Sequence, residues 1–110
     1  MIPQKMFVFA DNQTSAYTSK DCANAMSDLI DLQLSGEFTS CLVNLEGKVD
    51  LDADYQVLKV INLSKFEAVD DMEEAGIYEA AISGMQSLRV VINSVDGGAI
   101  KIVGRIMKEG

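Results

Sequence analysis

The carboxylates are the side chains of this sequence best able to do chemistry, because the chain contains no histidine to act as a base or a metal ligand. Asp50, Asp52 and Asp54 alternate in the segment DLDADY, with the spacing of the first three oxygen ligands of an EF-hand calcium loop. Tyr55, however, stands where that loop needs glycine, and Ile61 where it needs the bidentate glutamate. An EF-hand is therefore excluded. Two interpretations remain, a looser Ca²⁺ site between strands and a solvated acidic turn, and we expect no other cofactor.

Catalytic residues are not evident elsewhere in the chain. The segment DDMEE at 70–74 crowds four carboxylates into one stretch without the apolar surroundings that would raise a pKa for acid–base work. Cys22 and Cys41 are the only cysteines, and neither a C-x-x-C pair nor a histidine accompanies them to form a zinc site. We predict that both are reduced and structural, and that the protein is not an enzyme.

The charge of the chain argues against nucleic acid as a partner. Nine Lys and Arg residues against 17 Asp and Glu residues give a net charge of −8, which repels phosphate and anionic lipid. The N-terminal apolar run, Met6 to Ala10, is shorter than the roughly 7 to 15 residues of a signal-peptide core, and no later run approaches the ~20 residues of a membrane span. We therefore expect synthesis in the cytoplasm and no contact with membranes.

Alternation of apolar and polar residues predicts strands in several parts of the chain. The segment FTSCLVNLEG at 38–47 and the β-branched segment YQVLKVINL at 55–63 are each typical of a strand, and Met6 to Ala10 is a further candidate. The charged segment SKFEAVDDMEEAG is predicted to be a long connection. Three strands follow, at 77–83, 88–95 and 99–107, and we expect them to form a three-stranded antiparallel meander closed by the tight-turn segment DGG at 96–98.

The segment at 20–30 has two interpretations. Cys22, Ala25, Met26 and Leu29 recur at helical spacing behind a candidate cap at Thr18, which predicts a short helix. The positions from 26 to 34 also alternate in the manner of a strand, and turn residues follow at 35–38. We favour a strand over 28–34 because the rest of the chain is β.

These elements together predict an all-β protein. Six or so short strands separated by turn residues are typical of an antiparallel β-sandwich or jelly-roll-like domain, and 110 residues suffice for one such domain. We expect residues 1–35 to supply the N-terminal strands, or a strand and the short helix, and residues 36–107 to form the core of the sandwich.

The order of segments over residues 36–107 resembles β-sandwich proteins of tailed-bacteriophage virions, such as head decoration (cement) proteins and head fibres. The shared features are Glu46-Gly47 followed by an acidic loop, AGIY at 75–78, Leu88-Arg89-Val90, Gly97-Gly98 and Gly104-Arg105. Many such modules carry DG-x-x-W after the first of these strands, whereas this chain has DLDADY, with Tyr55 in place of the tryptophan.

The resemblance implies a virion structural protein, synthesised in the host cytoplasm and placed on the capsid surface. Its partner would be the major capsid protein or another virion protein, and it would be a homo-oligomer, for which a trimer is expected by similarity to fibres and cement proteins. Arg89 and Arg105 are the interface candidates. Arg89 has a second interpretation, in which it faces solvent beside Asn93.

A function of a different class remains open, namely a tail- or fibre-associated adaptor, or a carbohydrate- or receptor-binding module. Such a module needs an exposed aromatic platform. The chain has no tryptophan, and the feature that separates the two functions is whether Tyr17, Tyr55 and Tyr78 gather at the surface or lie in the core.

Overall fold

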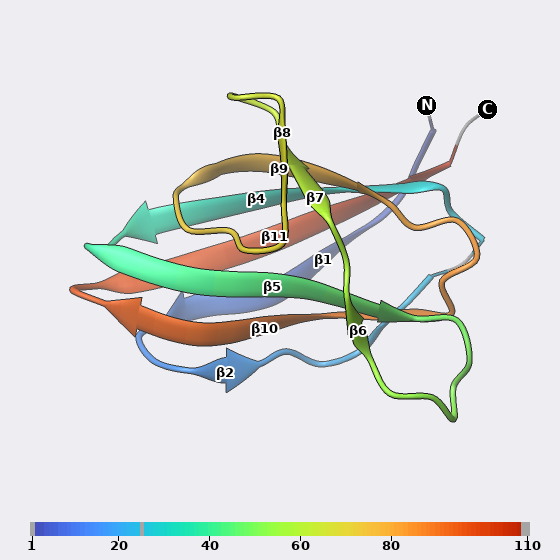
Figure 1. The fold of residues 1–110 in the computed structure, drawn as a ribbon, viewed down its shortest axis with the longest axis horizontal. Helices are drawn as coiled ribbons and strands as arrows, with labels where there is room; N and C mark the ends of the chain where they lie inside the picture. Colours follow the sequence, from blue (N-terminus) through green and yellow to red (C-terminus); the bar gives the residue numbers. More distant parts are fainter. Residues whose placement is uncertain (1, 25, 109–110) are drawn as a thin grey trace.

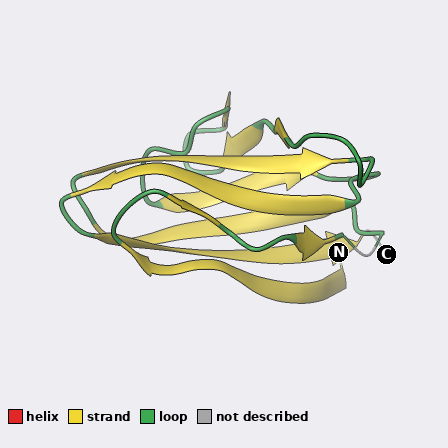
Figure 2. Cartoon of the chain, turned by 90° about the horizontal axis from the view of Figure 1, so that it is seen from below, coloured by secondary structure: helices red, strands yellow, loops and turns green. Residues whose placement is uncertain are grey.

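The computed structural model describes residues 2–24 and 26–108, and these form two antiparallel β-sheets packed face to face (Figure 1, Figure 2). The expected all-β sandwich is confirmed. The strands are β1 (Ile2–Gln13), β2 (Tyr17–Thr18), β3 (Cys22–Ala23), β4 (Leu29–Glu37), β5 (Ser40–Lys48), β6 (Gln56–Val57), β7 (Val60–Asn62), β8 (Glu67–Val69), β9 (Gly76–Ala81), β10 (Ser87–Asp96) and β11 (Ala99–Lys108).

The two sheets differ in size and strand order. The six-stranded sheet has the order β1-β11-β4-β9-β7-β8, and the five-stranded sheet has the order β2-β10-β5-β6, with β3 also paired to β10. Within the described chain, no helix has the length and apolar character needed to cross a bilayer.

One folded ladder joins the two sheets. The chains β4–β5 and β10–β11 pair along almost their whole length, with Glu37 opposite Ala99 in one sheet and Ser40 opposite Asp96 in the other. Between these pairs the ladder bends, so that each chain passes from one sheet to the other. A Cβ on Gly98 would lie 1.8 Å from the Glu37 carbonyl oxygen, so only glycine allows the two chains to approach this closely.

The predicted three-stranded meander is therefore wrong. β9 lies in the six-stranded sheet between β4 and β7, β10 lies in the five-stranded sheet, and β11 lies between β1 and β4. The tight hairpin turn predicted at 96–98 is not formed either: the chain bends at Gly97 and Gly98, both with positive φ, and passes from one sheet to the other. Turn residues specify a change of direction, and they do not specify which strand becomes the neighbour.

The single strand predicted at 55–63 is also corrected. It divides into β6, which pairs with β5, and β7, which pairs with β8 and β9 in the other sheet. Figure 1 shows this segment running across the other strands from one layer to the next. The connection predicted after it contains β8 and a bridge from Met72 to Val43 on β5.

The short helix predicted near residues 20–30 is absent from the described part of that segment. Cys22 and Ala23 form β3 against β10, and Leu29 begins β4, which extends through the predicted turn to Glu37. Met26 has a φ of 59°, a left-handed conformation that ends any α-helix. The preference for a strand in this region is confirmed, and Ala25 lies outside the described residues.

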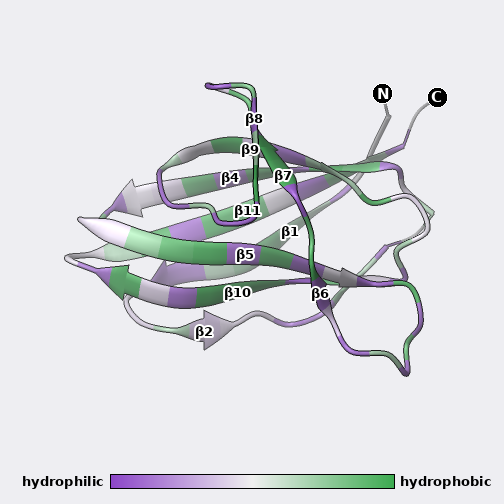
Figure 3. Cartoon of the chain, viewed as in Figure 1, coloured by the Kyte–Doolittle hydropathy of each residue, from purple (hydrophilic) through white to green (hydrophobic). Residues whose placement is uncertain are grey.

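The core lies between the sheets and follows the predicted alternation. In β10 and β11 the inward positions are Leu88, Val90 and Ile92 and Ile100, Ile102 and Ile106, and all six are at most 1% exposed. Hydrophilic and hydrophobic residues alternate visibly along these strands in Figure 3. The outward positions of both sheets therefore hold the side chains that can meet other molecules.

Both cysteines are free and buried, as the sequence predicted. Burial raises the pKa of each thiol above its ordinary value. At neutral pH such thiols stay protonated and are poor nucleophiles.

Candidate interaction surfaces

Arg89 is paired within the chain on the outward face of the five-stranded sheet. Its register partner on β5 is Glu46, and Arg89 Nε donates to Glu46 Oε1 at 2.8 Å. The two side chains are 32% and 16% exposed, so the pair is partly shielded from solvent. The Arg89 guanidinium carbon also lies 4.1 Å from the centroid of the Tyr55 ring. The charge of Arg89 therefore already has partners inside the molecule. A role for Arg89 at an interface stays a prediction.

Tyr55 contacts several charged and polar side chains in this part of the surface. Lys48 Nζ lies 4.5 Å from the ring centroid, so two cations contact the aromatic ring. The hydroxyl donates to Asp21 Oδ1 at 2.8 Å and lies 2.7 Å from Ser87 Oγ, whose proton it can accept. Burial raises the pKa of Tyr55, which keeps the hydroxyl protonated and able to donate. Tyr55 thus connects β10, β5 and the β2–β3 segment.

The three aspartates of the calcium hypothesis lie in an exposed loop. Asp50 Oδ1 accepts a hydrogen bond from the backbone N–H of Asp52 at 2.9 Å, and the Asp50 carbonyl accepts one from Ala53 at 3.0 Å. These bonds form a local turn around Asp50. Among the residues that the structure describes, no group of three or more His, Cys, Asp or Glu side chains is arranged to hold a metal ion. Both interpretations, the looser Ca²⁺ site and the solvated acidic turn, stay predictions.

Arg105 lies on the outward face of the six-stranded sheet. Its register partners are Met6 on β1 and Asp31 on β4. The guanidinium turns toward β1, where Nη2 donates to Met6 Sδ at 3.8 Å. No ion pair of Arg105 forms among the described residues. The second interface candidate is therefore an exposed cation without a carboxylate partner in its own described chain.

Two acidic side chains lie side by side next to Arg105. Asp31 on β4 faces Glu79 on β9 in the ladder. The pKa of Glu79 is raised, because hydrogen bonding to Asp31 favours its protonated form and because burial and the charge of Asp31 act in the same direction. Asp31 Oδ1 is buried and has no hydrogen-bond donor among the described residues. The sequence analysis missed this pair, since its members are 48 positions apart and only the strand order brings them together.

A shallow hollow and exposed apolar side chains surround these charges. The hollow has a volume of about 320 Å³ and is lined by Met6, Asp31, Leu32, Gln33, Ile77, Val103 and Arg105. Met6 is 62% exposed, Val8 52%, Ile77 45% and Ile61 43%. We call the set Met6, Val8, Asp31, Gln33, Ile61, Ile77, Glu79, Val103 and Arg105 the outer face of the six-stranded sheet.

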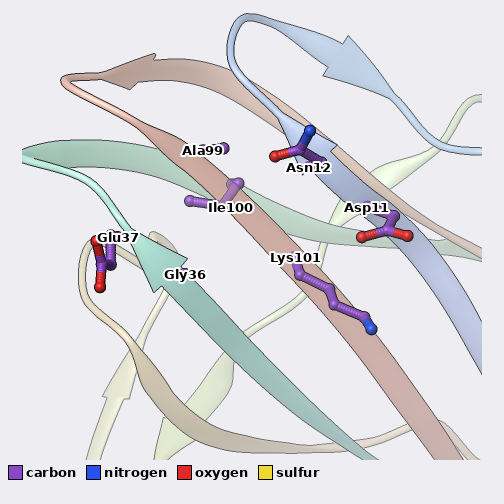
Figure 4. Close-up of a pocket in the computed structure, with 7 residues that line it drawn as sticks. All are labelled: Asp11, Asn12, Gly36, Glu37, Ala99, Ile100 and Lys101. Atoms are coloured by element: carbon purple, nitrogen blue, oxygen red, sulfur yellow. The ribbon is translucent and has the colours of Figure 1, made fainter.

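A second hollow lies at the far end of the same sheet. It has a volume of about 290 Å³, and Figure 4 shows its lining residues on β1, β4 and β11, namely Asp11, Asn12, Gly36, Glu37, Ala99, Ile100 and Lys101. Asn12 has a φ of 54°, which marks the irregular end of β1. The hollow is shallow, and its lining combines charges of both signs. It therefore does not point to a particular ligand.

The loops at one end of the sandwich expose apolar side chains from a rigid base. Asn24 Nδ2 donates to the carbonyls of Ile82 and Met85 at 2.9 and 3.0 Å, which ties the β3–β4 loop to the β9–β10 loop. Met26, two residues later, is 84% exposed. The β5–β6 loop reaches the same end in Figure 1 and exposes Val49 at 65% and Leu51 at 62%. We call residues 24, 26–28, 49–55 and 82–86 the loop end.

The three tyrosines do not form a surface platform. Tyr78 is 1% exposed, and its hydroxyl donates to the Glu74 carbonyl at 2.7 Å, as expected for a core or corner residue. Tyr55 is half-buried among the charged groups described above, and Tyr17 is half-buried on β2 at the other edge of the sheet. The side chains therefore lack the arrangement that would stack against a sugar ring.

Two solved structures share this fold. The crystal structure of SPBc2 prophage-derived protein YomS matches with a TM-score of 0.86 at 19% sequence identity, over 96% of this chain and 95% of YomS. The crystal structure of PBSX exported protein XepA matches with a TM-score of 0.87 at 16% identity, over 93% of this chain. Both are phage-derived proteins.

The two matches differ in extent. YomS corresponds to this chain along nearly its whole length, whereas the chain spans only 37% of XepA. At such low identities the similarity establishes the fold, and it is compatible with a phage protein. No known protein family matches the sequence, and no curated protein matches it.

Proposed function

We propose that this chain is a non-enzymatic structural protein of a phage virion, a capsid decoration (cement) protein that binds the major capsid protein on the surface of the head. The observation that carries this proposal is the match in fold, over nearly the whole of both chains, to a prophage-derived protein. The residue pattern over 36–107, which resembles virion β-sandwich proteins, supports it independently.

The loop end supplies the contact with the capsid. Met26, Val49 and Leu51 are large apolar side chains that a folded monomer gains nothing by exposing, and a partner surface would remove them from water. Asn24 fixes the loop that carries Met26, so little conformational freedom is lost on binding. Each contact is weak, and the repeated capsid lattice offers many such sites, so that linked copies hold the surface with high avidity.

The alternative is a tail- or fibre-associated adaptor, or a carbohydrate- or receptor-binding module. An isolated aromatic side chain, Phe66, is 83% exposed at the turn between β7 and β8. The three tyrosines do not add to it, because they lie elsewhere and are packed. We therefore rank this function second.

Gold labelling of purified particles with an antibody to this protein tests the proposal directly. Label spread over the head supports decoration. Label confined to the tail or to fibres would favour the alternative, and unlabelled particles would overturn the virion role.

Binding of added protein to heads that lack it tests the contact surface. We expect the double variant Met26→Lys, Leu51→Lys to bind these heads at least tenfold more weakly than the unchanged protein. Thr14→Lys, an exposed change in the β1–β2 loop, is the matched control and should bind normally. Equal binding of all three proteins would show that the loop end is not the capsid contact.

A further inference from the structure

A continuous row of side chains crosses the outer face of the six-stranded sheet. Each member faces the next in the strand register, from β1 through β11, β4 and β9 to β7. The row reads Met6, Arg105, Asp31, Glu79, Ile61. It begins and ends with an exposed apolar residue, has a cation on one side of β4 and has an anion on the other.

The next row on this face differs in having no charge. Val8, Val103, Gln33 and Ile77 face one another in the register, so that the polar residue on β4 has an apolar neighbour on each side. If a second copy faces this sheet, a half-turn about an axis parallel to β4 in the plane between the two facing sheets places β11 of one copy over β9 of the other and β1 over β7. Each row of one copy then lies over the same row of the other, so that Arg105 faces Glu79 and Met6 faces Ile61.

Among the described residues, the charges of the first row form no ion pair within their own chain. Arg105 forms no ion pair with a described residue, and its polar contact is the Met6 sulfur. Asp31 and Glu79 are neighbouring acids, and Asp31 Oδ1 is buried without a donor among the described residues. Within one chain β4 separates Arg105 from Glu79, a distance of about 10 Å between strand axes.

We propose that the outer face of the six-stranded sheet binds the same face of a second copy of this chain, about a two-fold axis that runs parallel to β4 in the plane between the two facing sheets. Arg105 of each copy meets the Asp31–Glu79 pair of the other, and Met6 of each copy packs near Ile61 of the other. Such an interface is isologous, because the same patch serves both subunits. The opposite charges set the orientation, and the apolar rows remove about four large side chains per copy from water.

The size of the face is sufficient for a stable dimer. The molecule measures 39 × 31 × 22 Å, and the sheet spans the two longer dimensions. A standard interface buries roughly 800 Å² per partner, which is less than this face offers. The inferred symmetry is two-fold, in place of the trimer expected from the resemblance to fibres and cement proteins.

The dimer does not depend on the virion role. The loop end lies at the ends of the strands, away from the proposed interface. Because the two-fold axis runs parallel to the strands, the two loop ends of a dimer point in the same direction. Where the capsid contact also holds, one dimer could connect two neighbouring capsid subunits. Failure of capsid binding with an intact dimer would overturn only the proposed function.

Light scattering coupled to size-exclusion chromatography tests the proposal with the full chain at about 100 μM. We expect a mass of twice the 11.9 kDa of one chain. Arg105→Glu and Glu79→Arg should each yield monomers, because each places like charges across the interface. The double variant should restore the dimer, since the reversed charges again meet their opposites in the second copy. Lys20→Glu, on the β2–β3 segment, is the charge-reversal control and should remain dimeric.

Circular dichroism and melting curves of each variant separate loss of the dimer from loss of folding. A wild-type protein that stays monomeric, a trimer, or a dimer that withstands both single reversals would overturn the proposal. Single variants that dissociate without rescue in the folded double variant would equally contradict the Arg105–Glu79 contact.

Discussion

The ion pair between Arg89 and Glu46, capped by Tyr55, should contribute measurably to folding. A hydrogen bond to a charged group contributes about 1.5 kcal/mol at the lower end of its usual range, and a partly buried cation–π contact adds about 1 kcal/mol. Arg89 makes both, at 2.8 Å to Glu46 and 4.1 Å to the ring. We therefore expect Arg89→Ala to reduce the free energy of unfolding by about 2.5 kcal/mol.

A double-mutant cycle with Tyr55→Leu isolates the contact between the guanidinium and the ring. Urea unfolding followed by circular dichroism gives the free energy of each variant. The loss in the double variant should be smaller than the sum of the two single losses by about 1 kcal/mol. Exposed Lys20→Ala should change stability by less than about 0.5 kcal/mol. Losses that add up within experimental error would refute the stacking contact. An Arg89→Ala protein of unchanged stability but weakened assembly would instead support a role of Arg89 at an interface.

Three further predictions concern the core and the acid pair. Val90→Asp should abolish folding in thermal melts, because it buries a charge at a position 0% exposed, whereas exposed Asn93→Asp should melt like the unchanged protein. Tyr78→Phe should lose about 1 kcal/mol in urea unfolding by removing the hydrogen bond to a backbone carbonyl at 2.7 Å, and an unchanged midpoint would contradict that bond. The raised pKa of Glu79 means that the folded state binds the extra proton, so stability falls as pH rises from the ordinary value near 4.5 through the raised value. Glu79→Gln should remove that fall in monomeric protein and be the more stable form at pH 7, and parallel pH profiles would contradict the assignment.

The inward faces of the long strands could be predicted from the sequence because burial imposes a period of two. Val43 and Leu45, Val90 and Ile92, and Ile102 all lie in the core, as the alternation required. The assignment of strands to sheets could not be predicted in this way. The turn at 96–98 has the residues of a hairpin, yet the paired chains bend there together, and no local signal distinguishes a hairpin from such a bend.

The candidate sites depended still more on long-range pairing. The sequence singled out Arg89 and Arg105 but gave neither a partner. Glu46 is 43 positions from Arg89, and only the register of β5 and β10 brings them together. Tyr55 stood out only as a substitute for tryptophan, and its contacts with two cations follow from the path of the β5–β6 loop.

The outward faces of the two sheets contain the same kinds of side chain, an arginine and a carboxylate, but the ion pair forms in only one of them among the described residues. This difference suggests a function for the outer face of the six-stranded sheet. In each sheet, the arginine faces the carboxylate on the neighbouring antiparallel strand. Arg89 closes on Glu46, whereas Arg105 turns away from Asp31 toward Met6. Asp31 is one methylene shorter than glutamate and is already engaged with Glu79.

Replacing Asp31 with the longer glutamate should therefore allow an ion pair with Arg105 in the same subunit. If Arg105 is reserved for a second copy of the chain, Asp31→Glu should draw it into its own subunit and weaken the dimer. The expected change is about thirtyfold in Kd, because the dimer contains the contact twice and each pair contributes about 1 kcal/mol. Sedimentation velocity over a concentration series measures the change. Asp96→Glu, an exposed position on β10 in the other sheet, is the control, because it adds the same methylene without a change of charge. A Kd unaffected by Asp31→Glu, or weakened equally by Asp96→Glu, would mean that the open arginine of the six-stranded sheet does not govern self-association.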